Sequence, residues 1–349
     1  MQTVDIAVVG CGSWAVHAHL PAIAADPRAN LAAVVDTDPA ARTTAQATFG
    51  AKQAFASVEE MLPNVELDAA VVALPHALHA AAAMPLLEHG AHLLIEKPMV
   101  LTPADGRELL AAAEARDLEV VVGYTWHYNR QVAELQSQIR DGRIGKVEFV
   151  SCLFGSTVRE YYSGSPESYD LGYTRQPRRN TYSDPRLSGG GQGQTQLTHA
   201  AALLVHMADV RPTTVTAMTE SYELPVDLAD ALAVRFDNGA IGTLGSTGGV
   251  LFGHPEVLEY RIFGSGGHVA FDVMQGRAAI HGPDGAVDEV ALLDLPDRYP
   301  MHEPVRNLIA IAAEGAVNQS PGDVGQTVVE LLDAMYRSSA AGGQPVGVG

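Results

Sequence analysis

Two charged residues follow an apolar run without a break near the end of the first third of the chain. The stretch "LLIEKPMV" begins at Leu93, and its apolar residues to Ile95 predict a buried strand. Glu96, Lys97 and Pro98 come next. Burial of an unpaired carboxylate or ammonium is costly and shifts its pKa. We therefore expect this strand to end at a ligand crevice, where a lysine is desolvated on one side only.

A glycine pattern follows the first apolar run. In "VVGCGSWA", Gly10, Gly12 and Ala15 form a G-x-G-x-x-A sequence between a predicted strand and a predicted helix. Gly10 permits the tight turn, Gly12 lets the backbone approach a pyrophosphate, and Ala15 allows close packing of helix on strand. Asp36 ends the second strand, where a carboxylate accepts hydrogen bonds from a ribose diol and repels a 2′-phosphate. Because "DTDP" places no arginine beside Asp36, the sequence favours NAD over NADP.

A histidine pair follows the fourth apolar run, in "LPHALH". His76 and His79 are three residues apart, so they could share a helix face and bind a metal. No third ligand is evident, and we favour polar residues at a helix start beside a cofactor; no metal site is predicted. The predicted cofactor-binding residues are Gly10, Gly12, Ser13, Trp14, Asp36, Leu74, Pro75, His76, His79, Glu96 and Lys97.

These residues need a scaffold in which several strands end at one edge. Apolar strands alternate with helices up to residue 124, and such strands indicate a parallel sheet covered on both faces. The rhythm predicts a doubly wound dinucleotide-binding α/β domain over residues 1–124. Strands are expected at 4–10, 31–36, 52–55, 68–74, 91–96 and 118–124, with helices at 13–25, 38–49, 57–62, 76–89 and 103–116.

The pattern changes after residue 124 and predicts an α+β domain over residues 125–349 with an antiparallel sheet. Asn238-Gly239 between two alternating runs is a hairpin signal. The glycine-rich tail is either a last edge strand or frayed. The other expected elements are helices at 129–141, 194–208 and 324–338, a strand at 146–155 that begins a strand-rich region, and one long polar loop over 156–193.

Composition restricts the function classes. The chain has 349 residues, 47% of them hydrophobic, and a net charge of −19. A charge of this sign opposes binding to nucleic acid or to an anionic membrane. Cys11 and Cys152 form no disulfide framework. No apolar run reaches the ~18 residues of a membrane helix, and the N-terminus lacks the basic region of a signal peptide. We therefore expect a soluble, cytoplasmic protein.

The ordered set of motifs resembles the glucose–fructose oxidoreductase and inositol dehydrogenase family (Gfo/Idh/MocA). The matching features are "GCGSWA", Asp36, "LPHALH", "EKP", "LQSQIRDGRIGKVEFV", "GGGQGQTQLTH", "FDNGAIGTL" and "IFGSGGHVAF", which together span nearly the whole chain. The resemblance implies an N-terminal Rossmann domain and a C-terminal domain with an open-faced antiparallel sheet. It also implies NAD(P)-dependent chemistry at a carbinol carbon, and a homo-oligomer.

The resemblance further implies that Lys97 and His199 are catalytic. His199 suits a general base because the unperturbed pKa of histidine is about 6.5, and Lys97 could stabilise an alkoxide or itself be the base; the sequence leaves this division open. Two family positions that often hold aspartate are Thr195 and Ala202 here. The predicted substrate-binding residues are Lys97, Trp126, His127, Tyr128, Gln192, Thr195, Gln196 and His199.

The leading hypothesis is an NAD-dependent dehydrogenase of a sugar, cyclitol or glycoside, with a small-molecule polyol, sugar or glycoside as substrate. One alternative is a glycosidase that oxidises and re-reduces its substrate around a tightly held NAD. The other is a non-catalytic protein that binds NAD or sugar. Net NADH formation would separate the first hypothesis from both alternatives.

Overall fold

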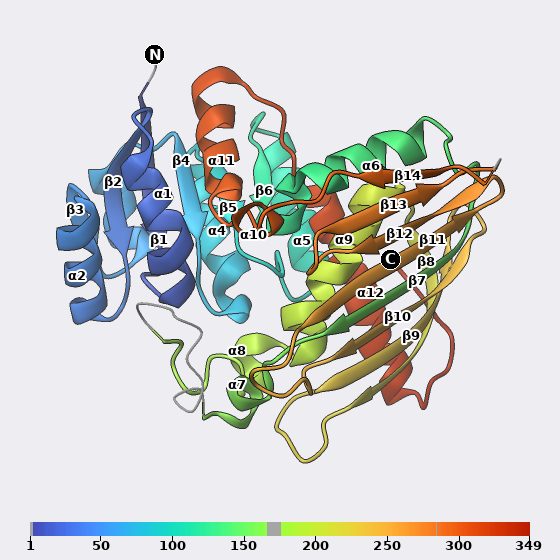
Figure 1. Ribbon diagram of the computed structural model, residues 1–349. Coiled ribbons are helices and arrows are strands. Elements are labelled where there is room, and N and C mark those ends of the chain that lie inside the picture. Colours follow the sequence, from blue (N-terminus) through green and yellow to red (C-terminus); the bar gives the residue numbers. More distant parts are fainter. Residues whose placement is uncertain (1–2, 166–175, 284) are drawn as a thin grey trace. The chain divides into compact units, whose positions relative to one another are not determined.

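The computed structural model describes residues 3–165, 176–283 and 285–349, and their contacts divide the chain into two units (Figure 1). The first unit comprises residues 3–124, 176–181 and 301–326, and the second comprises the remaining described residues. The chain first passes from the first unit to the second after Tyr124. The return of residues 301–326 to the first unit was not predicted from the sequence.

The first unit contains a parallel six-stranded sheet. The strand order is β3-β2-β1-β4-β5-β6, in which the chain reverses direction across the sheet between β1 and β4. This order confirms the doubly wound dinucleotide-binding fold. The strands are β1 (Val4–Val9), β2 (Ala29–Val35), β3 (Gln53–Phe55), β4 (Ala69–Val72), β5 (His92–Ile95) and β6 (Val120–Val122).

Helices connect these strands, and several begin and end where the sequence indicates. Asp38 caps α2 by accepting the Ala40 N–H at 2.9 Å, and the helix ends at Gly50, whose φ is +75°. The helical segments are the π-helical turn η1 (Ala15–His19), α1 (Leu20–Ala25), α2 (Pro39–Phe49), α3 (Val58–Met61), η2 (Leu62–Asn64), η3 (His76–Leu78), α4 (His79–Glu88) and α5 (Pro103–Glu114).

A late helix completes the core of the first unit. Helix α11 (Glu303–Glu314) packs beside β4 and β5, as Figure 1 shows in orange-red against blue strands. Val305 and Leu308 of α11 join Ile6 and Leu20 in one fully buried cluster. Each such side chain contributes roughly 1.5–3 kcal/mol of burial free energy, so the Rossmann unit is completed by residues far along the chain.

The second unit is built on a nine-stranded sheet of order β14-β13-β12-β11-β7-β10-β9-β8-β15. Its pairs are antiparallel except that β10 runs parallel to β7. The predicted hairpin joins β9 and β10 at Gly239, where φ is +89°. The strands are β7 (Val147–Gly155), β8 (Pro212–Glu220), β9 (Ala229–Phe236), β10 (Ile241–Thr247), β11 (Val257–Gly264), β12 (Gly267–Asp272), β13 (Arg277–His281), β14 (Val287–Val290) and β15 (Val346–Gly347).

Helices cover one face of this sheet. Burial alternates along β9, so one side of the strand faces the core and the other faces solvent. Figure 1 shows α9 and α12 on the covered face. The helical segments are η4 (Thr125–Tyr128), α6 (Arg130–Arg140), α7 (Arg159–Ser163), α8 (Pro185–Ser188), the π-helical turn η6 (Gly193–Leu197), α9 (Thr198–Ala208), α10 (Leu295–Arg298) and α12 (Gly322–Ala340).

The structure corrects one expectation for the second half and decides between two alternatives for the tail. Residues 156–193 are not a single loop, because α7 and α8 lie within them; residues 166–175 of that stretch lie outside the described part. Both are short helices that end at left-handed glycines, Gly164 and Gly189, and so give little periodicity to detect. The tail is an edge strand, since Val346 of β15 pairs with Val215 of β8.

Candidate cofactor and substrate sites

The glycine turn has the backbone that its sequence predicts. Gly10 follows β1 with φ +98°, and a Cβ there would lie 2.2 Å from the Ala73 carbonyl oxygen. Nothing lies within 4 Å of a Cβ built on Gly12, which leaves the backbone open on that side. Ala15 is fully buried under the first helical turn. The turn therefore fits the pyrophosphate of a dinucleotide, which needs close backbone approach and N–H donors.

Asp36 is fixed beside this turn at the end of β2. Its Oδ2 accepts the Cys11 N–H at 2.9 Å, and its Oδ1 accepts the Asp38 N–H at 2.8 Å. These bonds orient the carboxylate toward the place expected for the adenosine ribose. The two carboxylate oxygens retain lone pairs for ribose hydroxyls.

The fold brings two arginines near Asp36, although "DTDP" itself contains none. Arg42, on α2, donates to the Asp36 carbonyl oxygen at 3.0 Å. Arg178 lies 3.9 Å from the Asp36 carboxylate and 3.6 Å from that of Asp38. Neither arginine is adjacent to Asp36 in the chain, so the sequence around Asp36 does not indicate them.

His79 links the loop after β4 to the loop after β5. Its Nε2 lies 2.9 Å from the Leu74 carbonyl oxygen, and its Nδ1 lies 2.9 Å from that of Pro98. Burial lowers the pKa of His79, and hydrogen bonds to these carbonyls act in the opposite direction. Since both ring nitrogens face carbonyl oxygens, neither is placed to ligate a metal. Its neighbour His76 is also buried, with the ring centroids 5.9 Å apart.

Glu96 is a buried carboxylate held by histidine. The side chain is 8% exposed, and His19 Nε2 lies 2.8 Å from its Oε1. Its Oε2 also accepts the Lys97 N–H at 3.2 Å. Burial alone would raise the pKa of Glu96, but the hydrogen bond and charge of His19, with the charge of Lys97, outweigh it and lower that pKa. A Cβ at Gly123 would lie 2.6 Å from Oε1, so only glycine fits behind the carboxylate.

Lys97 follows at the end of β5 with its side chain half-buried. Burial lowers the pKa of its ammonium to about 8, against an upward effect of the Glu96 charge. The Lys97–Pro98 peptide bond, which the sequence left open, is cis. At neutral pH this lysine is therefore close to its titration point, which suits a group that gives or takes a proton.

His199 lies in the second unit, on the buried side of α9. It is 5% exposed, and the Trp126 ring meets it edge to face with centroids 5.2 Å apart at 78°. Trp126 also contacts Phe154 and Tyr299, with centroids 5.9 Å and 5.0 Å away. Trp126 thus fixes one face of the imidazole within an aromatic cluster.

The side chains of Gln192 and Thr195, which precede His199, are hydrogen-bonded to other groups of the protein. Gln192 accepts from Tyr162 Oη at 3.1 Å and donates to Ser246 Oγ at 2.7 Å. The Thr195 hydroxyl donates to the Gly191 carbonyl at 2.8 Å and is hydrogen-bonded to Tyr162 Oη. These contacts fix both side chains, whereas Gln196 is half-buried.

The residues after β6 differ in exposure. His127 is buried and stacks on His206, with ring centroids 4.1 Å apart at 11°. Burial and the neighbouring His206 hold the pKa of His127 well below its ordinary value. Tyr128 is half-buried. His127 is therefore a neutral ring at physiological pH.

The predicted residues fall into two groups by unit. Those expected to hold the cofactor lie in the first unit, at the carboxyl ends of β1, β2, β4 and β5 or in the loops that follow. The substrate candidates other than Lys97 lie in the second unit. Among residues 3–165, 176–283 and 285–349, no cluster of three or more His, Cys, Asp or Glu could hold a metal.

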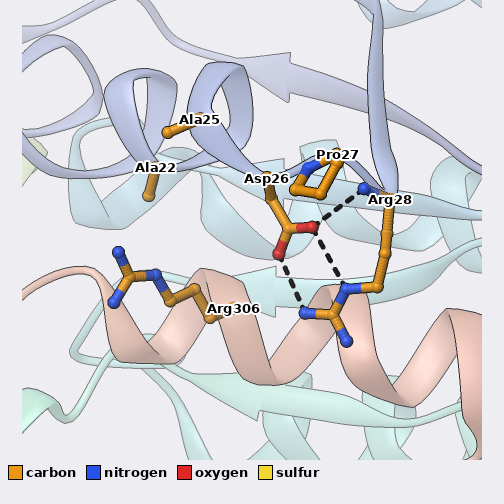
Figure 2. Close-up of a pocket in the computed structure, with 6 residues that line it drawn as sticks. All are labelled: Ala22, Ala25, Asp26, Pro27, Arg28 and Arg306. Carbon is orange, nitrogen blue, oxygen red and sulfur yellow. Dashed lines mark hydrogen bonds and ion pairs between the residues drawn. The ribbon is translucent and has the colours of Figure 1, made fainter.

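A surface hollow of the first unit lies at the opposite edge of the sheet. Figure 2 shows Asp26 and Arg28 joined there, with Nη2 2.8 Å from Oδ2, near Arg306 of α11. The Arg28 carbonyl oxygen accepts the Val4 N–H at 2.8 Å. This hydrogen bond places the hollow at the amino ends of β1 and β2. Ligands of doubly wound sheets bind at the carboxyl ends, so we assign this ion pair a structural role.

Comparison with known proteins decides the family. Residues 4–124 match the profile described as "Oxidoreductase family, NAD-binding Rossmann fold", and residues 132–270 match that of the GFO/IDH/MocA C-terminal domain. The chain belongs to the Gfo/Idh/MocA family. The two matches confirm the family resemblance and the NAD-binding Rossmann domain.

Relatives and solved structures agree with this assignment. A 1-carboxy-3-chloro-3,4-dihydroxycyclohexa-1,5-diene dehydrogenase of Comamonas testosteroni is 26% identical over 73% of this chain and 60% of its own length. A dTDP-3,4-didehydro-2,6-dideoxy-alpha-D-glucose 3-reductase of Saccharopolyspora spinosa is 25% identical over 98% of this chain and 99% of its own. The fold matches levoglucosan dehydrogenase in complex with NADH and levoglucosan, with a TM-score of 0.84, 19% identity and full coverage of both chains.

The structure also reveals two acidic residues that the sequence reasoning missed, Asp227 and Asp230. Asp227 accepts the N–H groups of Gly191 and Gly193, each at 2.8 Å, and the Tyr336 hydroxyl at 3.0 Å. Asp230 is 4% exposed, and burial together with the Asp227 charge raises its pKa well above the ordinary value. Asp227 and Asp230 therefore form a buried acidic pair beneath the glycine turn that precedes His199. A signal was present, since Asp230 occupies an inward-facing position of β9.

No helix within the described residues is long and apolar enough to cross a membrane.

Proposed function

We propose that this protein is an NAD-dependent oxidoreductase that transfers a hydride between nicotinamide and a carbinol carbon of a sugar, cyclitol or glycoside. The family, the glycine turn at Gly10 and Gly12, and the oriented carboxylate of Asp36 support NAD as the cofactor. The named relatives include a dTDP-sugar 3-reductase and a dihydroxycyclohexadiene dehydrogenase.

The observation that carries the proposal is the lysine that follows β5. NAD accepts a hydride from the carbinol carbon when it is bound, and the hydroxyl must lose its proton in the same conversion. Lys97 has a pKa lowered to about 8 by burial, so near neutral pH its ammonium can hold an alkoxide and its amine can accept a proton. We assign the hydroxyl proton to Lys97 and His199 together.

The aromatic and polar residues of the second unit are the proposed substrate contacts. Trp126 and Tyr128 can pack against a sugar ring. Gln196 is half-buried and can bond a hydroxyl, whereas Gln192 and Thr195 would act through the network that fixes them. His127 is proposed to support this group through its stacking on His206.

A substrate screen tests the proposal. Aldoses, inositols, other polyols and glycosides would be incubated with protein and NAD, and NADH formation followed by absorbance. We expect one class to yield NADH, and His199→Asn to abolish turnover while NAD affinity stays unchanged. Silence across all four classes would reject the dehydrogenase proposal.

The two alternatives have distinct outcomes in the same assay. A glycosidase with transient oxidation would hold NAD stoichiometrically and cleave a glycoside without net NADH. A binding protein would bind NAD and a sugar without turnover. The names of the relatives, which are dehydrogenases and reductases, do not favour either alternative.

We also propose a homo-oligomer and a cytoplasmic location. The outward face of the large sheet exposes apolar residues on neighbouring strands: Leu153 on β7, Ile241 on β10 and Phe263 on β11 are 47%, 46% and 40% exposed. A second copy of the chain would cover such a face. Light scattering after size exclusion tests this, and a monomeric mass would reject it.

A further inference from the structure

An arginine reaches the adenosine side of the predicted cofactor site from a distant part of the chain. The Nη2 of Arg178 lies 3.9 Å from Asp36 Oδ1 and 3.6 Å from Asp38 Oδ2. Residues 176–181 belong to the first unit, so all three side chains lie in that unit. The Arg178 side chain is 61% exposed and remains accessible to a ligand.

The carboxylate that it faces is the one expected to recognise ribose. Asp36 is held by the N–H groups of Cys11 and Asp38, so its position is set by the backbone. An isolated aspartate at this position repels a ribose 2′-phosphate, and an arginine nearby can accommodate that phosphate. This structure supplies both groups at one place.

The local charge balance differs from that of the sequence segment alone. "DTDP" contributes two carboxylates, from Asp36 and Asp38. Arg178 adds one positive charge beside them, and Arg42 adds another where it donates to the Asp36 carbonyl. The four charges sum to zero, so the repulsion expected for a 2′-phosphate is largely offset. Guanidinium groups also match phosphate oxygens in geometry.

We propose that Arg178 is a cofactor-specificity residue whose guanidinium lets this site bind NADP measurably, more weakly than NAD. This rests on the cofactor half of the proposed function and is independent of the substrate. NAD has no 2′-phosphate, so its binding depends on Asp36 and the glycine turn and not on Arg178. Neutralising Arg178 should therefore weaken NADP binding selectively.

Titration calorimetry with NAD and with NADP tests the proposal on purified full-length protein without substrate. For an exposed ion pair we expect Arg178→Gln to raise the ratio Kd(NADP)/Kd(NAD) by about three- to tenfold. The Kd for NAD should change by less than about twofold on the same scale, which also shows that the variant is folded. Arg178→Lys should retain part of the affinity for NADP, because lysine keeps the positive charge but lacks the paired N–H donors of the guanidinium.

Arg179→Gln is the matched control, since it removes an exposed arginine from the same segment, and it should leave the ratio unchanged. Raising the salt concentration should narrow the difference between wild type and Arg178→Gln, because exposed charges are screened. An unchanged ratio in Arg178→Gln, or equal weakening of both cofactors, would overturn the proposal. Because only binding is measured, a failed substrate screen would not affect the outcome.

Discussion

His19 places its imidazole Nε2 2.8 Å from the carboxylate of Glu96, and both side chains are buried. Glu96 in turn accepts the backbone N–H of Lys97. The first helix after the glycine turn is thereby joined to the residue that precedes the proposed catalytic lysine. A buried histidine thus fixes the cofactor-binding segment and the reactive segment relative to each other within the first unit.

Removing this histidine should destabilise the first unit. His19→Ala leaves the Glu96 carboxylate buried without its main partner, which typically costs about 3 kcal/mol. His19→Gln should cost less, because the amide can still donate. Urea unfolding of wild type and both variants measures this order. Equal stability of His19→Ala and wild type would show that Glu96 needs no partner.

The charge of Glu96 should be visible in the pH profile. That charge raises the pKa of Lys97, so Glu96→Gln should move the pKa of Lys97 further below about 8. The limb of the kcat/KM profile that reports Lys97 should shift to lower pH. A shift of the acidic limb would identify the amine as base, and a shift of the basic limb would identify the ammonium as donor. An unmoved profile would exclude Lys97 from the rate-limiting proton transfer.

Lys97 should also reduce stability at neutral pH. Its folded-state pKa of about 8 lies below the ordinary value of 10.5, so the folded protein binds this proton more weakly than the unfolded chain does. The resulting penalty is fully present below pH 8 and disappears as pH rises from there to 10.5. Lys97→Met should therefore melt at a higher temperature than wild type at pH 7, with the gap closing by pH 10.5. A variant that melts lower at pH 7 would contradict the buried-ammonium interpretation.

The two aspartates beneath the glycine turn should respond differently to amide substitution. Asp227 accepts three hydrogen bonds, so Asp227→Asn should cost about 2 kcal/mol. Burial and the Asp227 charge raise the pKa of Asp230, so folding disfavours its carboxylate relative to the unfolded chain. Asp230→Asn removes a carboxyl group whose charged form the fold disfavours, and it should be neutral or stabilising at pH 7.

The pH dependence separates these variants further. A raised folded-state pKa gives stability that is present below the unfolded pKa and lost as pH rises. The advantage of Asp230→Asn over wild type should therefore vanish below pH 4, where both states are protonated. Thermal unfolding at pH 3.5 and pH 7 measures the difference. An Asp230→Asn variant as destabilised as Asp227→Asn at pH 7 would contradict the raised pKa of Asp230.

The parts of the fold around the candidate site that the sequence predicted were those with local signals. The turn at Gly10 and the apolar strand before Glu96 each occupy a few consecutive residues. Neighbouring residues in the chain set the backbone geometry of such short segments. Asp36 was placed correctly because strand ends of a parallel sheet converge on one edge.

The parts that were missed depend on contacts between distant segments. Arg178 meets Asp36 only after the chain has left the first unit and returned. Helix α11 is recognised as core only when Val305 and Leu308 are seen against β4 and β5. The positions of Arg178 and α11 depend on tertiary packing, which local secondary-structure propensities do not encode.

The central claim is most directly tested by one comparison of NADH formation on a substrate identified in the screen. Wild type, Lys97→Ala and the control Lys52→Ala, an exposed lysine of the same unit, would be assayed with saturating NAD. We predict that Lys97→Ala lowers kcat by about a hundredfold or more at saturating NAD, with the Lys52→Ala rate unchanged. Full turnover by Lys97→Ala would contradict the account.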